Sequence, residues 1–362
     1  MSVIGVVGRE YIGNDVEKEI FEWWEKNKIY EKAKKLREGR PKFYFLDGPP
    51  YVTNPIHVGT AWNKILKDAF LRYFRMRGYD VRDQPGYDMH GLPIEVMVEK
   101  KLGLKTKKDI ETLGIKRFVE ECRSYALEHL KILEKQFKDL GVWMDWEKPY
   151  MTITQDYIEA EWWVVKKAEE KGLLAEGYMV FHWCPRCETV LSGYEVTEEY
   201  REVKDPSIYV KFPIEGKNNE YILIWTTTPW TLPANVAVMV HPEYTYVKTK
   251  VGDEVYILAE ARCEPVFKEA GLKYEIIERF PGSQLEGLKY IPPLLEEVDA
   301  QKKIRGVHRV VLSKEFVTLT EGTGCVHSAP GHGEEDFLVG LEYNLPVISP
   351  VDNTGKFTSE AG

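Results

Sequence analysis

The chain has 362 residues, a formal net charge of -9 at pH 7, 43% hydrophobic residues and 30% charged residues. This length allows two or three domains with cores of their own, and the acidic balance argues against non-specific coating of nucleic acid. No apolar run reaches membrane-spanning length, and the opening residues lack the basic region of a signal peptide. Five cysteines, only two of them closely spaced, favour a reducing cytoplasm over a disulfide-linked secreted protein.

The first half of the chain alternates helices with short strands. Residues 14–36 predict a surface helix, and KFYFLDGPP (residues 42–50) predicts a short buried strand ending in a Gly-Pro-Pro turn. The next helix has apolar residues at 3-4-3-4 spacing on one face: Trp62, Ile65, Leu66, Ala69, Phe70, Tyr73 and Phe74. Residues 79–103 repeat the cycle, and two more helices are predicted at 116–140 and 155–171. This alternation predicts a parallel α/β sheet, in which ligands bind at the carboxyl ends of the strands.

From about Pro206 the pattern changes to short β-rich runs separated by Gly, Pro and Asp. In chain order these runs are SIYVKFPI, EYILIWTTTPWTLP, VAVMV, YTYVKTK and EVYILA. Their length and spacing predict a barrel-like β domain, inserted into the first domain or appended to it.

The segment DGPPYVTNPIHVGT (residues 47–60) places a histidine where a proline-rich loop meets a helix. The free N–H groups and the dipole at a helix start favour an anion, and Gly59 removes a side chain that would hold a phosphate or nucleoside away from the backbone. His57 can donate to phosphate oxygens there, although a lone histidine at a helix start is more often a simple polar cap. A Gly-x-Gly dinucleotide fingerprint is absent from the loop, which argues against an NAD site.

Two further motifs carry candidate ligands. Asp88 follows a predicted strand, where a carboxylate suits an ion pair with a substrate ammonium group; the alternative is a local Asx-turn. Cys184 and Cys187 form a Cys-x-x-Cys, the spacing at which two thiolates bind one zinc ion. A redox dithiol is less favoured because the pair does not open a helix of a βαβ unit. A tetrahedral site needs two more ligands, for which His182 is a weaker candidate, and a knuckle without metal is the alternative.

The β-rich region contains two unusual peptides. WTTTPWTLPAN (residues 225–235) puts three successive hydroxyls at a strand end, and GTGCVHSAPGHGEEDF (residues 322–337) is a glycine-shaped loop that carries His327, His332 and Asp336. Taken separately, each peptide could be the turn-rich rim of a barrel. Together they place hydroxyl, imidazole and carboxylate groups in one domain.

These motifs resemble those of one family. PPYVTNPIHVGT resembles the His-Ile-Gly-His region of the class I aminoacyl-tRNA synthetases, and GYDMHGLPIE (residues 86–95) resembles the second fingerprint of the isoleucine enzymes in the branched-aliphatic subgroup. The two peptides of the β-rich region resemble the signature peptides of the editing domain in that subgroup. Thr60 departs from the common form, because a second histidine often stands there.

The resemblance implies a fold and a domain organisation. The fold class is α/β, a Rossmann-like parallel-sheet catalytic domain (first half) with an inserted β-barrel-like editing domain. The implied parts are an N-terminal helical segment (1–45), the first half of the catalytic domain (46–182), a zinc-knuckle linker (183–203) and an editing domain incomplete at its C-terminus (204–362). A Lys-Met-Ser-Lys-Ser-like segment and an anticodon domain are not found, so the chain is interpreted as an amino-terminal fragment.

The resemblance also implies roles for individual residues. His57, Gly59 and Thr60 would belong to the ATP site, with Mg²⁺ bound to ATP, and Pro49, Asp88 and His90 would bind the amino acid. The editing residues would be Thr226, Thr227, Thr228, Asn235, His327 and Asp336. Cys184 and Cys187 would supply half of a Zn²⁺ site, completed in the family by a second Cys-x-x-Cys beyond this chain.

The implied function is ATP-dependent attachment of isoleucine to tRNA(Ile) through isoleucyl-adenylate, with hydrolytic editing of mischarged valyl-tRNA(Ile). The fragment alone is expected not to aminoacylate. The partners would be tRNA(Ile), isoleucine and ATP, with no membrane, and the full-length enzyme is expected to be a cytoplasmic monomer. The alternatives are a valine or leucine enzyme, a hydrolase that deacylates mischarged tRNA in trans, and a catalytically silent tRNA-binding protein.

Overall fold

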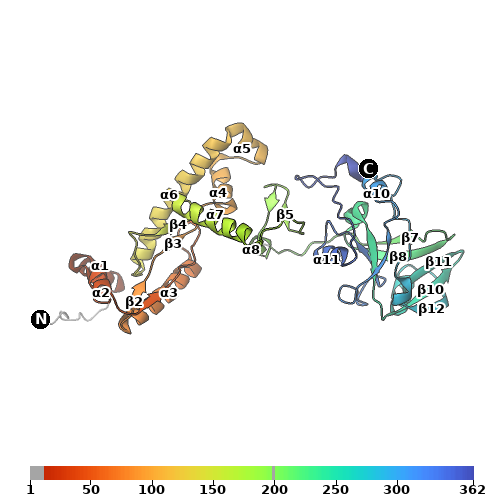
Figure 1. The fold of residues 1–362 in the computed structure, drawn as a ribbon, viewed down its shortest axis with the longest axis horizontal. Helices are drawn as coiled ribbons and strands as arrows, with labels where there is room; N and C mark the ends of the chain where they lie inside the picture. The colour runs from red at the N-terminus through yellow and green to blue at the C-terminus, as the bar shows by residue number, and fades with distance from the viewer. Residues whose placement is uncertain (1–11, 198–199) are drawn as a thin grey trace. The chain divides into compact units, whose positions relative to one another are not determined.

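The computed structural model describes residues 12–197 and 200–362 of the chain (Figure 1). The chain divides into two compact units, unit 1 up to Ala175 and unit 2 from Glu176 onward. Among the described residues, no helix combines the length and the apolar character that a membrane span requires.

Unit 1 is a mixed α/β unit with small parallel sheets. Its helices are α1 (Gly13–Asn27), α2 (Ile29–Lys35), α3 (Val58–Met76), α4 (Leu92–Leu102), α5 (Lys107–Leu113), α6 (Ile115–Asp139) and α7 (Gln155–Glu170). Its strands are β1 (Lys42–Tyr44), β2 (Asp80–Arg82), β3 (Gly86–Tyr87) and β4 (Tyr150–Met151). β1 pairs with β2 and β3 pairs with β4, both in parallel, as the alternation of strands and helices predicts. Tyr51 forms a parallel bridge with Asp88, which adds the segment after β1 to the β3–β4 pair.

The core of unit 1 lies where α4 and α6 pack under β3. Tyr87 and Ile94 are completely buried there, together with Phe137 of α6. The predicted helix at 14–36 is in fact two helices, α1 and α2, because Lys28 adopts a left-handed conformation with φ of 49° and ends the first.

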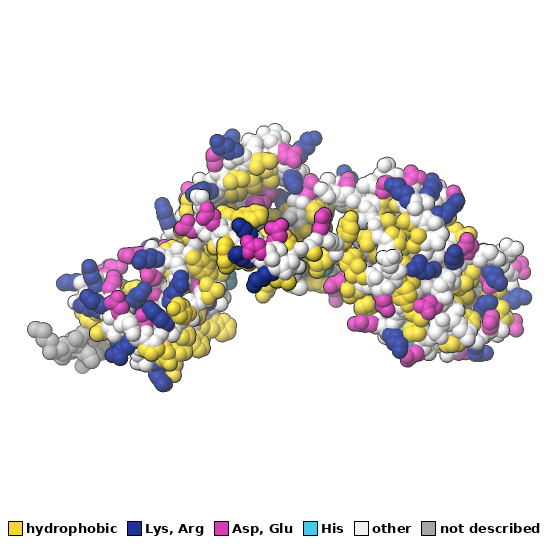
Figure 2. All heavy atoms as spheres, viewed as in Figure 1, with side chains coloured by type: hydrophobic (Ala, Val, Ile, Leu, Met, Phe, Trp, Pro, Cys, Tyr) yellow, Lys and Arg dark blue, Asp and Glu magenta, His cyan; other side chains and the backbone are white. Residues whose placement is uncertain are grey.

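The apolar face predicted for the helix after the histidine exists, but it does not face the core of unit 1. α3 instead packs through Lys64, Leu71 and Arg75. The exposed fractions of Trp62 and Phe70 are 66% and 60%, and Figure 2 shows apolar side chains gathered over this part of the molecule. The expectation of a buried strand at 42–50 is also wrong, since only Lys42–Tyr44 is a strand and its burial is at most partial.

A buried ion pair explains why a lysine occupies the inner face of α3. Lys64 and Asp47 are both almost fully buried and form a salt bridge, and the Nζ of Lys67 lies 2.6 Å from the other carboxylate oxygen of Asp47. The N–H of Gly86 donates to Asp47 over 3.0 Å. Burial of one charge without the other would be costly, so this pair ties α3 to the loop after β1 and to β3.

Unit 2 is built mainly of strands. They are β5 (Trp183–Cys184), β6 (Thr189–Val190), β7 (Ile208–Pro213), β8 (Glu220–Thr226), β9 (Ala237–Val240), β10 (Thr245–Val251), β11 (Glu254–Ala259), β12 (Glu275–Pro281), β13 (Arg309–Leu312) and β14 (Cys325–Ser328). The helical elements are α8 (Gly193–Thr197), η1 (Pro229–Ala234), α9 (Glu260–Glu269), η2 (Gly282–Leu285), α10 (Asp299–Lys303), α11 (Glu334–Glu342) and η3 (Ser359–Ala361).

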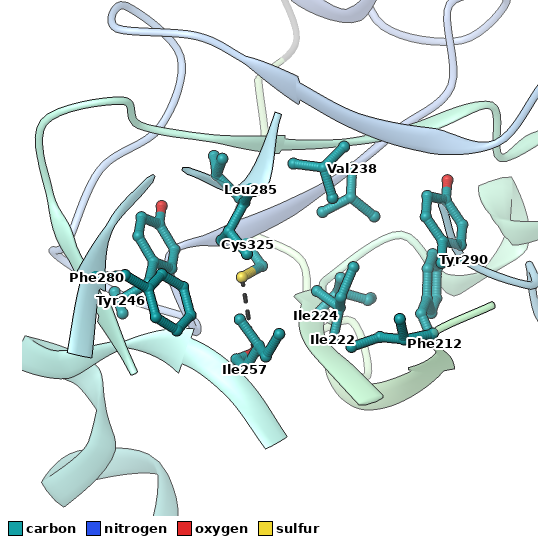
Figure 3. Packing of buried hydrophobic residues seen from close by; sticks show 14 of the residues in the cluster. Phe212, Ile222, Ile224, Val238, Tyr246, Ile257, Phe280, Leu285, Tyr290 and Cys325 are labelled. Carbon is teal, nitrogen blue, oxygen red and sulfur yellow. Dashed lines mark hydrogen bonds between the residues drawn. The ribbon is translucent and has the colours of Figure 1, made fainter. Parts of the chain in front are cut away.

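Two sheets of unit 2 share one core. The larger sheet has the order β12-β10-β11-β8-β7 and the smaller has the order β13-β9-β14. β8–β11 and β9–β13 are parallel pairs, while the other pairs in these sheets are antiparallel. Ile224 of β8, Val238 of β9 and Cys325 of β14 meet in the core (Figure 3). The barrel-like closure expected for this region stays a prediction, because the described pairings define two sheets.

Candidate functional sites

A pocket of about 510 Å³ lies in unit 2, between the end of β8 and the loop that flanks β14. Its lining includes most of both unusual peptides: Trp225, Thr226, Thr227, Thr228, Trp230, Thr231, Gly322, Thr323, Gly324, Cys325, Val326, His327, His332, Gly333 and Asp336. Five of the six predicted editing residues therefore border one pocket. The sixth, Asn235, lies behind the wall and contacts His327.

The threonine hydroxyls at the end of β8 are held by the turn into η1. The N–H of Thr228 donates to the Oγ1 of Thr226 over 3.0 Å, and the two Oγ1 atoms lie 3.2 Å apart. Thr231 donates to the backbone oxygen of Thr228 over 2.8 Å. Because these side chains bond to their own turn, the hydroxyls of Thr226, Thr228 and Thr231 are ordered before any ligand arrives.

His327 is buried on β14, with both ring nitrogens engaged. Its Nε2 lies 2.8 Å from the Oγ1 of Thr231 and its Nδ1 lies 2.8 Å from the Nδ2 of Asn235. Burial, and secondarily the neighbouring His332, lowers the pKa of His327 to about 4. The imidazole is therefore neutral at pH 7 and acts as a fixed hydrogen-bonding group.

Asp336 supplies a carboxylate from the first turn of α11. Burial raises its pKa to about 6, although the N–H of Ala329, which donates to Oδ2 over 3.0 Å, acts in the opposite direction. A Cβ at Gly333 would lie 2.6 Å from that same oxygen, so a larger residue there would displace the carboxylate. A mostly ionised, poorly solvated carboxylate in a pocket wall is suited to an ammonium group.

Sequence reasoning left two residues of this pocket without a role. Thr231 is the hydroxyl partner of His327, and no signal in the sequence links residues so far apart. His332 borders the pocket, and its Nε2 is buried without a hydrogen-bond partner among the described residues. The glycines on either side of His332 were the available signal, because they mark a loop shaped for close approach.

In unit 1, Asp88 and His90 lie together at the carboxyl end of β3. The Oγ1 of Thr152, just after β4, lies 3.4 Å from the Oδ1 of Asp88 and 3.3 Å from the Nδ1 of His90. Thr152 was not predicted, and only the pairing of β3 with β4 brings it here. His90 also borders a pocket of about 380 Å³ with Ile94 and Phe118 in its lining.

His57 caps α3, as the simpler interpretation of the sequence has it. Its Nδ1 accepts a hydrogen bond from the N–H of Gly59 over 3.1 Å. In a neutral ring the proton is then on Nε2, which is free to donate to an anion. Thr60 is half-buried in the first turn, and Pro49 is half-buried in the preceding loop.

The structure does not join the ATP group to the amino-acid group by a contact. Tyr51 forms a parallel bridge with Asp88, and His57 follows six residues after Tyr51, at the N-terminal end of α3. The side chain of His57 bonds to its own helix, whereas the side chain of Asp88 contacts Thr152. The backbone of Asp88 bonds to Pro50 and Val52 of the loop before α3.

The cysteine pair forms a tight turn between β5 and β6. The N–H of Cys187 donates to the Sγ of Cys184 over 3.4 Å. Burial raises the pKa of the Cys184 thiol, but hydrogen bonds from Cys187 and Arg186 outweigh it and leave the pKa below its ordinary value. No group of three or more His, Cys, Asp or Glu side chains in the described parts of the chain could hold a metal ion. The residues present therefore do not complete a four-ligand zinc site.

Comparisons with known proteins agree with these motifs. The family model for tRNA synthetases class I (I, L, M and V) matches residues 19–320. The chain belongs to this family.

Among curated relatives, the isoleucine–tRNA ligase of Pyrococcus horikoshii is 58% identical over 358 residues, which cover 96% of this chain and 34% of that protein. The isoleucine–tRNA ligase of Methanocaldococcus jannaschii is 55% identical over 356 residues, 95% of this chain and 34% of that protein. The chain thus spans about a third of the length of the curated relatives it matches.

Two of the solved structures with some similarity are LeuRS structures. A crystal structure of GlLeuRS-CP1 has a TM-score of 0.31 and 17% identity, covering 38% of this chain and 65% of that one. A LeuRS–tRNA–LeuAMS ternary complex from Agrobacterium radiobacter K84 has a TM-score of 0.42 and 17% identity, covering 92% of this chain and 44% of that one.

Proposed function

We propose that this chain carries two sites of an isoleucine–tRNA ligase, part of an ATP-dependent activation site in unit 1 and a hydrolytic editing site in unit 2. The observation that carries the proposal is 58% identity with an isoleucine–tRNA ligase over 358 residues, which cover 96% of this chain. The full-length enzyme would attach isoleucine to tRNA(Ile) through isoleucyl-adenylate. Its partners would be tRNA(Ile), isoleucine and ATP, and it would work in the cytoplasm as a monomer.

An editing site would be needed because binding energy alone discriminates poorly between isoleucine and valine. Isoleucine exceeds valine by one methylene, which is worth about 1–3 kcal/mol in a hydrophobic pocket, and this pair is the standard example of that limit. A second site that hydrolyses the valine ester removes the error. The domain assigned to editing would be an inserted barrel, of which unit 2 describes two sheets with a common core.

The pocket of unit 2 supports ester hydrolysis by positioning. Asp336 would hold the ammonium group of the misattached amino acid, and the hydroxyls of Thr226, Thr227 and Thr228 would surround the ester and a water molecule. His327 would orient this arrangement as a neutral donor, because its pKa of about 4 leaves the ring uncharged at pH 7. Fixed donors aimed at a developing negative charge lower a barrier without rearrangement during the reaction.

The activation site would use the residues at the carboxyl ends of the parallel segments. Asp88 would pair with the ammonium group of isoleucine, and Pro49 and His90 would border its side chain. His57 would donate from Nε2 to a phosphate oxygen, while Gly59 and Thr60 keep the helix start open to the nucleotide. Mg²⁺ would arrive with ATP and neutralise phosphate charge. We assign no step to it, since the described residues include no metal-binding group of three.

The cysteine turn would be half of a structural zinc site. Cys184 and Cys187 have the spacing of two zinc ligands, and the N–H···S bond between them holds one thiolate acceptor in place. Two further ligands would come from outside the described residues. The turn contributes no step to either reaction.

Deacylation in the absence of ATP tests the editing proposal with this chain alone. We expect hydrolysis of valyl-tRNA(Ile) and little hydrolysis of isoleucyl-tRNA(Ile). Asp336→Asn should lower kcat/KM by about 100-fold because it removes one partner of a buried charge pair. Glu334→Gln on the same helix is the matched control, since Glu334 is exposed and does not line the pocket. Absence of hydrolysis, or equal loss in both variants, would refute the proposal.

ATP–pyrophosphate exchange in the full-length parent tests the activation site. Exchange should depend on isoleucine far more than on valine, and Asp88→Asn should raise the KM for isoleucine. A leucine or valine preference would favour the alternative enzymes of the subgroup. Hydrolysis without any exchange in the parent would favour a hydrolase that acts in trans.

A further inference from the structure

A chain of buried hydrogen bonds leads from the core of unit 2 to the pocket. Asn235 is fully buried, and its Nδ2 lies 3.0 Å from the backbone oxygen of Ala237 and 2.8 Å from the Nδ1 of His327. A carbonyl oxygen only accepts, so the amide atom beside Ala237 must be the nitrogen. The same nitrogen donates its second proton to the Nδ1 of His327, because that contact of 2.8 Å is much shorter than the 3.5 Å to the backbone oxygen of Ser328.

The other side of this amide meets a tyrosine that does not line the pocket. The hydroxyl of Tyr290 lies 2.6 Å from the Oδ1 of Asn235. Tyr290 packs against Phe212 in the apolar core, and Figure 3 shows its hydroxyl directed away from that ring. Burial raises the pKa of Tyr290 well above its ordinary value. It is therefore a neutral phenol that donates to Asn235.

The direction of every later bond follows from these two. Because the Nδ1 of His327 accepts, the proton of the neutral ring is on Nε2, which donates to the Oγ1 of Thr231 over 2.8 Å. The hydroxyl of Thr231 in turn donates to the backbone oxygen of Thr228 over 2.8 Å. The chain of donors thus runs from Tyr290 through Asn235, His327 and Thr231 to the threonine turn of the pocket.

The backbone of Asn235 is also held, which leaves rotation of its amide as the movement open to it. Gln301 donates from Nε2 to the backbone oxygens of Asn235 and Pro233 over 2.9 and 2.8 Å. The Nε2 of His308 lies 2.7 Å from the Oε1 of Gln301. A buried network in which each group has a partner specifies one arrangement.

We propose that Tyr290 is a positioning residue of the hydrolytic pocket, which fixes the amide of Asn235 and thereby keeps His327 in the Nε2–H tautomer. The tautomer itself is a property of the fold, while its effect on hydrolysis rests on the proposed function. With Nδ1 occupied, His327 is not a general base; its task is to hold the hydroxyl of Thr231 toward the turn. Without the phenol, the Oδ1 of Asn235 loses its donor, and the backbone oxygen of Ala237 is left as the group that favours this orientation of the amide. The rotated amide then becomes populated, and it places an acceptor against Nδ1, which must carry the proton in that form.

The tautomer is tested without substrate, by ¹⁵N NMR of the 362-residue chain labelled at histidine, with His327 assigned from a His327→Gln variant. We expect a pyridine-type shift at Nδ1 and a pyrrole-type shift at Nε2. Tyr290→Phe should bring in the Nδ1–H tautomer, and Tyr256→Phe should not. Tyr256 is the matched control because its exposed fraction is 4% against 3% for Tyr290, and its hydroxyl bonds to Glu254.

A protonated Nδ1 in the wild-type chain, or identical spectra for Tyr290→Phe and Tyr256→Phe, would overturn the proposal. If the Tyr290 variant does not fold, Asn235→Asp provides the second test. A carboxylate there accepts from both neighbours and must switch His327 to the Nδ1–H form, so an unchanged tautomer would also overturn it.

Hydrolysis of valyl-tRNA(Ile) is the second readout. Tyr290→Phe should lower kcat by about 10- to 100-fold with little change in KM, because a buried acceptor without its donor misplaces the pocket. Tyr256→Phe should retain activity. An inactive wild-type chain with the expected tautomer would reject the proposed function and leave the positioning of His327 intact, whereas unchanged kcat in a folded Tyr290 variant would reject the positioning role.

Discussion

Lowering the pH from 7 to 5 should destabilise unit 2, and the buried histidines set the sign. Burial lowers the pKa of both His327 and His308 to about 4. The unfolded chain protonates these rings near pH 6.5, so between the two values the unfolded state binds more protons and stability is lost as the pH falls. Asp336 acts in the opposite direction. Its carboxyl takes up a proton near pH 6 when folded, before the unfolded value of 3.8 is reached, so acid stabilises through this group.

The magnitudes decide which effect dominates. For a shift from 6.5 to about 4, the free energy of unfolding falls by about 2 kcal/mol per histidine between pH 7 and pH 5. The pKa of Asp336 is shifted from 3.8 to about 6, so protonation of this group raises the free energy of unfolding by about 1 kcal/mol over the same pH range. The pKa of His332 is also lowered by burial, so it adds to the loss. Unit 2 is therefore expected to lose about 3 kcal/mol.

The fall in the free energy of unfolding of unit 2 can be measured by hydrogen exchange of peptides that cover β9 and β14. Exchange is followed as a function of urea concentration at each pH, and the rates are corrected for the intrinsic pH dependence of exchange. His308→Gln should reduce the loss by about 2 kcal/mol, whereas Asp336→Asn should increase it by about 1 kcal/mol. Changes of opposite sign separate the two groups from a general effect of acid. A stability that does not vary between pH 7 and pH 5, or variants that shift it in the same direction, would refute the reasoning.

Two further predictions concern the buried ion pair of unit 1 and the close approach of Gly333 to Asp336. Lys64→Met should destabilise unit 1 by about 3 kcal/mol in urea, because it removes the buried one of the two lysines that pair with the carboxylate of Asp47. Lys135→Met at an exposed pair should cost under about 1 kcal/mol. Equal costs would contradict the burial argument. Gly333→Ala should push the carboxylate of Asp336 from its place, costing about 1–3 kcal/mol in unfolding and reducing deacylation. Full activity in that variant would show that the carboxylate need not stay where it is.

The sequence predicted the bounds of the long helices well, but it did not predict which face of a helix is buried. α6 and α7 lie within a residue of the predicted 116–140 and 155–171, because sustained periodicity and a following glycine define both ends. α3 has the expected length and apolar face, yet the opposite face is buried. The polar face can be buried because Asp47 pairs with Lys64 and Asp83 pairs with Arg75 inside unit 1. The periodicity of a helix does not reveal which residues elsewhere in the chain pair with its charged side chains, so the buried face could not be predicted.

The candidate sites show the same division. Hydroxyls, glycines and titratable groups marked two peptides of unit 2, and the family resemblance selected candidate residues in them, five of which line one pocket. Thr231 and Tyr290 were missed because each acts through a partner remote in sequence, at separations of 96 and 55 residues. Thr152 was missed for the same reason, since it reaches Asp88 only through the pairing of β3 with β4. A sequence motif identifies the residues within it. The residues that hydrogen-bond to the motif from distant parts of the chain are identified only by the three-dimensional structure.

The exposure of the two sites bears on which chemistry this chain can perform alone. In unit 2, His327 is buried and Asp336 is partly buried. Both groups have fixed hydrogen-bond partners, which is the preorganisation that ester hydrolysis by positioning requires. In unit 1, His57 and Gly59 are exposed, and a hydrogen bond to a phosphate in open water exchanges with solvent at little gain. Adenylate formation needs charge neutralisation around three phosphates, which one imidazole and a helix start do not supply. Valyl-tRNA hydrolysis without aminoacylation is therefore the expected behaviour, and charged tRNA made by this chain would contradict it.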